Sequence, residues 1–86
     1  MEFKLSQHAE EKLKQRGIKR TQIEAVLNAP QQILDEDGKK VYQSKLERVS
    51  GKTHLLRIVV ASLANPPVVV TAYWTDQIDK YWREET

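Results

Sequence analysis

The spacing of apolar residues changes at Pro30, and this change constrains the fold more than any other feature of the sequence. Before Pro30, apolar residues such as Ile23, Val26 and Leu27 recur at helical spacing. After Pro30 the pattern alternates from one residue to the next, as it does in strands. We therefore expect an α+β fold, with helices first and strands after them.

Two short helices are expected before Pro30. The first covers roughly residues 7–16, with Ser6 at its N-cap and Gly17 as its stop signal. The second begins at Thr21-Gln22-Ile23-Glu24, which has the S/T-x-x-E form of a capping box. It ends at Asn28-Ala29-Pro30, because the residue before a proline is pushed out of helical geometry.

Strands joined by tight turns are expected after Pro30. Residues 53–63 are the expected central strand, because both of their faces are largely apolar. Consecutive strands joined in this way pair antiparallel, so we expect two N-terminal helices packed on one face of a three- to four-stranded antiparallel β-meander, with the other face open. The other expected elements are strands at 31–34, 39–49 and 68–74, turns at 35–38, 50–52 and 65–67, a short C-terminal helix capped by Thr75 or Asp76, and a lead-in strand or core cap at Phe3 and Leu5.

Length and composition exclude several classes of protein. Eighty-six residues suffice for one domain, so residues 1–86 are expected to form a single domain. The absence of cysteine excludes disulfides and thiolate metal sites. Two histidines and an acidic turn without the calcium-loop pattern indicate no metal, and no cofactor is expected. The longest apolar runs are too short to span a bilayer or to form a signal peptide, so we expect a cytoplasmic protein without a membrane partner.

Charge is distributed unevenly along the chain. Residues 1–20 carry a net +3 and residues 39–57 a net +5, whereas residues 21–38 carry −4. If the fold places the two basic segments side by side, they form a surface that attracts phosphate backbones, with Lys39, Lys40 and Lys45 as the expected RNA-binding residues. The alternative is an ordinary solvated, lysine-rich face.

Two residues of the first helix are candidates for chemistry on a phosphodiester, which needs a base or acid and a cation. His8 and His54 are the side chains suited to proton transfer near neutral pH. His8 lies about 80° from Arg16 around the helix, so the two can flank one cleft. Arg16 lies on the apolar stripe and needs an anion, carbonyls or a cleft. The alternatives are that His8 is simply exposed and that Arg16 binds the last carbonyls of its own helix.

Two strand residues complete the candidate site. Arg57 stands among apolar residues on its face of the central strand, so it either pairs with a carboxylate such as Glu47 or lines a site. Thr71 and Tyr73 share a face of the last strand, and a hydroxyl pair opposite an arginine suits a phosphate. A cross-strand packing pair is the alternative.

An ordered set of short motifs runs from about Leu5 to Trp74. It comprises His8-Ala9, Lys12-Leu13, Gln15-Arg16-Gly17-Ile18, Ile23-Glu24-Ala25-Val26-Leu27, Pro30, Leu56-Arg57-Ile58-Val59-Val60 and Val70-Thr71-Ala72-Tyr73-Trp74. In this set the chain resembles a prokaryotic domain-of-unknown-function family related to the BrnT and RelE toxins, within the RelE/ParE-like superfamily. The resemblance implies an antiparallel sheet cradled by two N-terminal helices. It also implies a metal-independent ribonuclease in which a 2′-hydroxyl attacks the adjacent phosphate.

The resemblance also implies roles for individual residues. His8 would be base or acid, Arg16 and Arg57 would hold the phosphate, and Thr71 would orient it. The protein would then be the toxin of a toxin–antitoxin system, with RNA and an antitoxin protein as partners. A non-catalytic RNA- or protein-binding module of the same fold is the alternative, and a homodimer formed through an exposed strand is a third interpretation.

Overall fold

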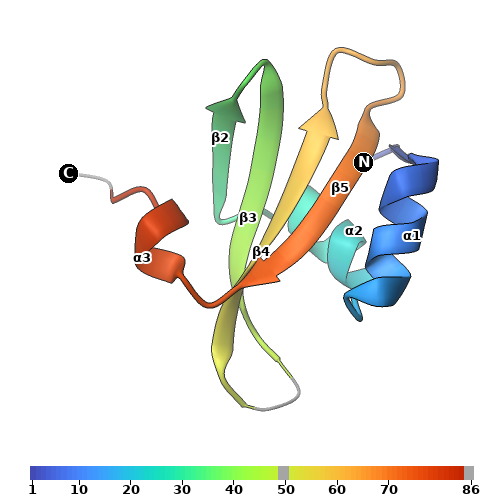
Figure 1. Ribbon diagram of the computed structural model, residues 1–86. Coiled ribbons are helices and arrows are strands. Elements are labelled where there is room, and N and C mark those ends of the chain that lie inside the picture. The colour runs from blue at the N-terminus through green and yellow to red at the C-terminus, as the bar shows by residue number, and fades with distance from the viewer. Residues whose placement is uncertain (49–50, 85–86) are drawn as a thin grey trace.

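The computed structural model describes residues 1–48 and 51–84 (Figure 1). Its elements are, in chain order, β1 (Lys4–Leu5), α1 (Gln7–Gln15), α2 (Arg20–Asn28), β2 (Gln32–Glu36), β3 (Lys39–Glu47), β4 (Thr53–Ala61), β5 (Val68–Thr75) and α3 (Ile78–Tyr81). The α+β class is confirmed, as are the two N-terminal helices and the short C-terminal helix. Val49 and Ser50, which belong to the expected strand 39–49 and turn 50–52, lie outside the described residues.

The sheet is larger than expected and is mixed rather than antiparallel. Its strand order is β1-β5-β4-β3-β2, so the expected central strand, β4, does lie in the middle. β1 runs parallel to β5, whereas the other pairs are antiparallel. Backbone N–H groups of Lys4 and Ser6 donate to carbonyl oxygens of Pro67 and Val69 at 2.9 and 3.0 Å. Strands β2–β5 form the expected four-stranded antiparallel meander, and β1 lies where a lead-in strand was one expectation. The parallel pairing of β1 was missed because its partner lies about sixty residues away in the sequence.

The start of α1 was predicted correctly, but that of α2 was not. Ser6 caps α1, since its Oγ accepts a hydrogen bond from the Ala9 N–H at 3.0 Å. In α2, however, Lys19 is the N-cap residue, and its N–H donates to Gln22 Oε1 at 2.9 Å. The expected capping box is absent because α2 begins at Arg20, which puts Thr21 inside the helix, and Glu24 accepts a hydrogen bond at 3.3 Å from Arg20.

Two other boundaries differ from the sequence prediction. Asp35 and Glu36 belong to β2, so the turn is narrower than expected, and Asp37 and Gly38 carry its positive φ angles of 51° and 77°. Asp35 and Glu36 pair with Lys40 and Lys39 of β3, and Lys40 Nζ lies 2.6 Å from the Asp35 carboxylate. The helix α3 has Gln77 at its N-cap position, rather than Thr75 or Asp76.

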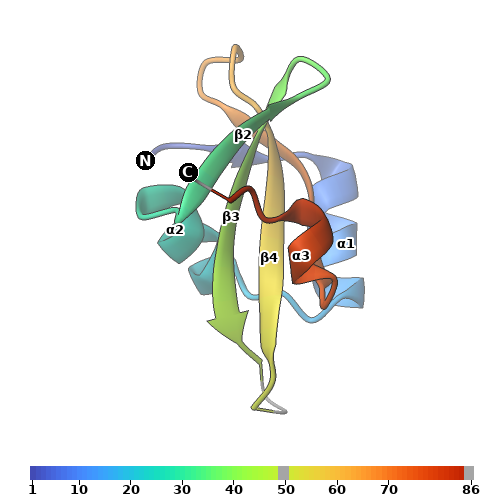
Figure 2. The same ribbon diagram turned by 90° about the vertical axis from the view of Figure 1, so that its left-hand side faces the viewer.

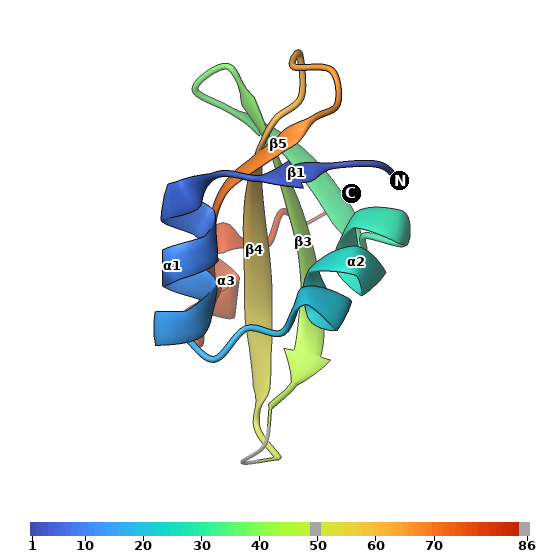
Figure 3. The same ribbon diagram turned by 90° about the vertical axis from the view of Figure 1, so that its right-hand side faces the viewer.

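The sheet separates two layers of helix. Figure 3 shows α1 and α2 on one face, where their apolar residues form the core with Leu56, Ile58 and Val60 of β4. Figure 2 shows α3 over the opposite face, which the sequence predicted to be open. That face is therefore partly covered. Among the described helices, none has the length and apolar character to cross a membrane.

Candidate nucleic-acid interface

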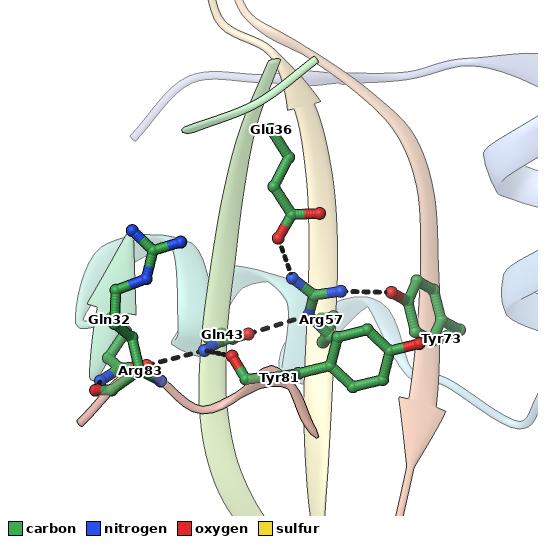
Figure 4. Close-up of polar contacts among 7 residues, drawn as sticks. All are labelled: Gln32, Glu36, Gln43, Arg57, Tyr73, Tyr81 and Arg83. Atoms are coloured by element: carbon green, nitrogen blue, oxygen red, sulfur yellow. Dashed lines mark hydrogen bonds and ion pairs between the residues drawn. The ribbon is translucent and has the colours of Figure 1, made fainter. Parts of the chain in front are cut away.

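Arg57 lies in the middle of β4 on the α3 face of the sheet, and it is 1% exposed (Figure 4). Its Nε donates to Gln43 Oε1 at 2.8 Å, and its Nη1 donates to the Tyr73 hydroxyl at 2.6 Å. Its Nη2 forms a hydrogen bond and an ion pair with Glu36. The expected carboxylate partner therefore exists, but it is Glu36 rather than Glu47, because β2 extends further than expected.

The helix α3 closes the network around Arg57. The Tyr81 ring centre lies 4.2 Å from the Arg57 guanidinium carbon. Gln43 Nε2 donates to Gln32 Oε1 at 2.7 Å and to the Tyr81 carbonyl at 3.1 Å. We call Gln32, Glu36, Gln43, Arg57, Tyr73 and Tyr81 the Arg57 cluster. Each guanidinium nitrogen of Arg57 has a protein partner. The contacts of Tyr81 with Arg57 and Gln43 attach α3 to the sheet.

Arg16 and Thr71 meet at the outer edge of β5. Arg16 Nη1 donates to the Ala72 carbonyl oxygen at 2.7 Å and to Thr71 Oγ1 at 3.3 Å. The side chain thus reaches the sheet, rather than binding the last carbonyls of α1. Two of the four predicted catalytic residues are therefore in direct contact.

His8 does not join them. It is exposed on α1, and within residues 1–48 and 51–84 no hydrogen bond or ion pair of its side chain is found. The side chain of Arg57 lies under α3, on the same face of the sheet as Thr71, but its guanidinium nitrogens are bonded within the Arg57 cluster. The structure therefore does not bring His8, Arg16, Arg57 and Thr71 together in one site.

The three lysines predicted to bind RNA do not form one surface either. Lys39 and Lys40 are adjacent in β3, and their side chains therefore point to opposite faces of the sheet. The Asp35 carboxylate, which accepts a hydrogen bond from Lys40, raises the pKa of Lys40. Lys45 lies near the other end of β3, with its Nζ 4.0 Å from the centre of the Trp82 ring.

A different group of cations and aromatic rings gathers where β3 and β4 approach α1 and α2. A hollow of about 680 Å³ lies there, beside a second of about 540 Å³. Arg48 and Trp74 line both hollows and form their common wall. We call Arg16, Lys19, Arg48, Lys52, His54 and Trp74 the Arg48–Trp74 surface. The remaining lining residues are Gly17, Gln22 and Glu47 in the first hollow and Gln15 and Tyr73 in the second.

Positive charge dominates this surface. Arg16, Lys19, Arg48 and Lys52 contribute four cations, whereas Glu47 is the one carboxylate among the described lining residues of the two hollows. Negatively charged groups of a ligand are attracted to such a concentration of cations. Anionic ligands are therefore favoured here.

The aromatic rings are held by their neighbours. The Arg48 guanidinium carbon lies 4.9 Å from the Trp74 ring centre. The His54 ring meets Trp74 edge-on, with centroids 6.5 Å apart and an interplanar angle of 84°. His54 Nδ1 also lies 3.3 Å from the Lys52 carbonyl oxygen. The site thus presents rings in fixed orientations beside its cations.

The sequence did not single out Arg48, Lys52 or Trp74 for this site, and it named His54, with His8, as suited to proton transfer without placing it in the site. One signal was available, because Arg48, Lys52 and His54 all lie in the +5 segment, residues 39–57. The contact with Trp74 had no local signal, since it joins residues far apart in the chain.

Comparison with protein families shows one match. Residues 5–74 match the family described as "Domain of unknown function (DUF4258)" and include every residue of the Arg48–Trp74 surface. Comparisons with curated proteins and with solved structures gave no match. The relation to BrnT and RelE toxins stays a prediction. The chain belongs to the DUF4258 family, whose function is unknown.

Proposed function

We propose that this protein binds single-stranded RNA on the Arg48–Trp74 surface. The observation that carries the proposal is the common wall of Arg48 and Trp74 between two hollows that are lined by four cations. Proteins that hold single strands combine cations, which follow the phosphates, with aromatic rings, on which bases stack. This surface supplies both kinds of group.

The aromatic rings of this surface favour a single strand over a duplex. The bases of a duplex are stacked on each other and are not available to Trp74 or His54, whereas those of a single strand are. Two adjoining hollows would then hold consecutive nucleotides.

A second candidate function is metal-independent RNA cleavage by the toxin of a toxin–antitoxin system. One observation favours it, the position of His54 among the cations of the proposed RNA site. The sequence resemblance to BrnT and RelE toxins, itself a prediction, points the same way. Expression of such a toxin slows bacterial growth, and co-expression of its antitoxin restores it. Unchanged growth at a verified expression level argues against this function.

Binding of a short fluorescent RNA by paired double variants tests the main proposal. Arg48→Ser with Lys52→Ser removes two charges from the Arg48–Trp74 surface, whereas Lys39→Ser with Lys40→Ser removes the same charge at the opposite end of β3. We expect the first double variant to weaken RNA binding about tenfold or more, and the second about twofold at most. The difference arises because a cation strengthens binding mainly where it contacts a phosphate. Equal losses in both variants, or no loss in the first, would contradict the proposed site.

A further inference from the structure

We propose that His54 is the general base for cleavage of RNA bound on the Arg48–Trp74 surface, an inference that rests on the RNA binding proposed above. The sequence placed this role on His8. The structure gives His54 three features that suit a base: a ring packed edge-on against Trp74, an Nδ1 contact with the Lys52 carbonyl and cations that line the same hollow.

Two contacts fix the His54 ring. Its edge-on packing against Trp74 restricts the ring plane, and its Nδ1 lies 3.3 Å from the carbonyl oxygen of Lys52. The side chain is half-buried. His8, in contrast, is exposed on the surface of α1, where its ring can take several rotamers.

The contact with Lys52 also sets the tautomer. A carbonyl oxygen only accepts hydrogen bonds, so the bond requires the proton on Nδ1. A neutral imidazole with its proton on Nδ1 has its lone pair on Nε2. His54 is therefore held in the form that can take a proton at Nε2.

The charges around His54 suit a phosphodiester. Arg48, Lys19 and Lys52 line the same hollow, and Glu47 is the carboxylate among its described lining residues. Cations positioned in this way bind the phosphate and stabilise the negative charge that builds up on it during reaction. The base and the groups that hold the phosphate thus belong to one hollow.

The reaction needs no further reagent. His54 Nε2 removes the proton of a ribose 2′-hydroxyl, and the 2′-oxygen forms a bond to the adjacent phosphorus. The bond from phosphorus to the 5′-oxygen breaks, and that oxygen takes a proton from water, while His54 returns its own proton to solvent. The products are a 2′,3′-cyclic phosphate and a 5′-hydroxyl end.

The test compares wild type, His54→Ala, His54→Gln and the control His8→Ala on a short labelled RNA in EDTA. Binding and cleavage are both measured, and circular dichroism checks the fold. We expect wild type and His8→Ala to cleave, and both His54 variants to cleave about 100-fold or more slowly while binding RNA within about threefold of wild type. Added imidazole should restore cleavage to His54→Ala but not to His54→Gln, whose side chain fills the site.

The outcomes separate the two proposals. A wild-type protein that binds RNA but does not cleave it overturns the role of His54 and leaves RNA binding intact. Folded His54 variants that cleave at the wild-type rate also overturn that role. A wild-type protein that neither binds nor cleaves RNA overturns both proposals.

Discussion

The guanidinium carbon of Arg48 lies 4.9 Å from the centre of the Trp74 ring, although 26 positions separate the two residues in the sequence. Trp74 comes from β5, and Arg48 follows directly after β3. The pair places a cation and a ring at the boundary of two hollows. If RNA binds there, the two side chains should contribute in physically different ways.

Salt dependence distinguishes these contributions. Arg48→Gln removes one phosphate contact, so we expect the negative slope of log affinity against log salt to become less steep by about 0.7. Trp74→Leu removes stacking and should weaken binding by about 1–3 kcal/mol without changing that slope. Fluorescence anisotropy across a salt series measures both. Equal changes of slope in the two variants would mean that Trp74 acts only by positioning Arg48.

The indole N–H of Trp74 gives a prediction about stability. Its Nε1 is buried and has no hydrogen-bond partner within the described part of the chain. An unsatisfied buried donor costs about 1–3 kcal/mol, so Trp74→Phe removes that cost while it loses some packing. We expect the free energy of unfolding in urea to change by less than about 1 kcal/mol. A loss above about 3 kcal/mol would show that the indole makes a favourable polar contact.

The Arg57 cluster should matter to stability rather than to RNA binding. Arg57→Leu leaves the Gln43 amide and the Tyr73 hydroxyl without their partner, so we expect unfolding free energy to fall by about 3 kcal/mol. Glu36→Gln should cost less than about 1 kcal/mol, because the Glu36 side chain is 41% exposed and an amide oxygen can still accept. Urea denaturation of both variants measures the difference. Similar small losses would show that the cluster does not secure α3.

The contact between α1 and β5 gives a matched pair of variants. Arg16→Met removes hydrogen bonds to both Ala72 and Thr71, and we expect it to lower unfolding free energy by about 2 kcal/mol. Thr71→Val removes only the 3.3 Å contact, so it should cost less than about 1 kcal/mol. Thermal and urea unfolding check this order. A larger loss in Thr71→Val than in Arg16→Met would show that the Thr71 hydroxyl makes the main contact between α1 and β5.

The sequence predicted the broad fold because its strongest signals are local. The change of period at Pro30 separates helices from strands, and Ser6 caps α1 as expected. The sequence allowed a lead-in strand at Phe3 and Leu5, but it could not predict the pairing of β1 with β5. The place of β1 beside β5 depends on backbone bonds to Pro67 and Val69, which no nearby residue specifies.

The candidate site was harder to predict than the fold. Arg16 and Thr71 were named together and do touch, whereas Arg57, on the same face of the sheet as Thr71, bonds to Gln43, Glu36 and Tyr73 instead. A face is set by strand register, and one residue of shift moves a side chain to the opposite face. His54 and Trp74 share a surface only because β4 and β5 pair in the observed register, which the sequence leaves open.

The fluorescence of single-tryptophan variants shows whether RNA contacts Trp74. Trp74 and Trp82 are the two tryptophans of the chain. Trp82→Phe leaves Trp74 as the reporter, and Trp74→Phe leaves Trp82, which lies against Lys45 on another part of the protein. We expect short single-stranded RNA to quench the emission of the Trp82→Phe protein and to leave that of the Trp74→Phe protein unchanged. Quenching of Trp82 alone, or of neither residue at saturating RNA, would contradict RNA binding on the Arg48–Trp74 surface.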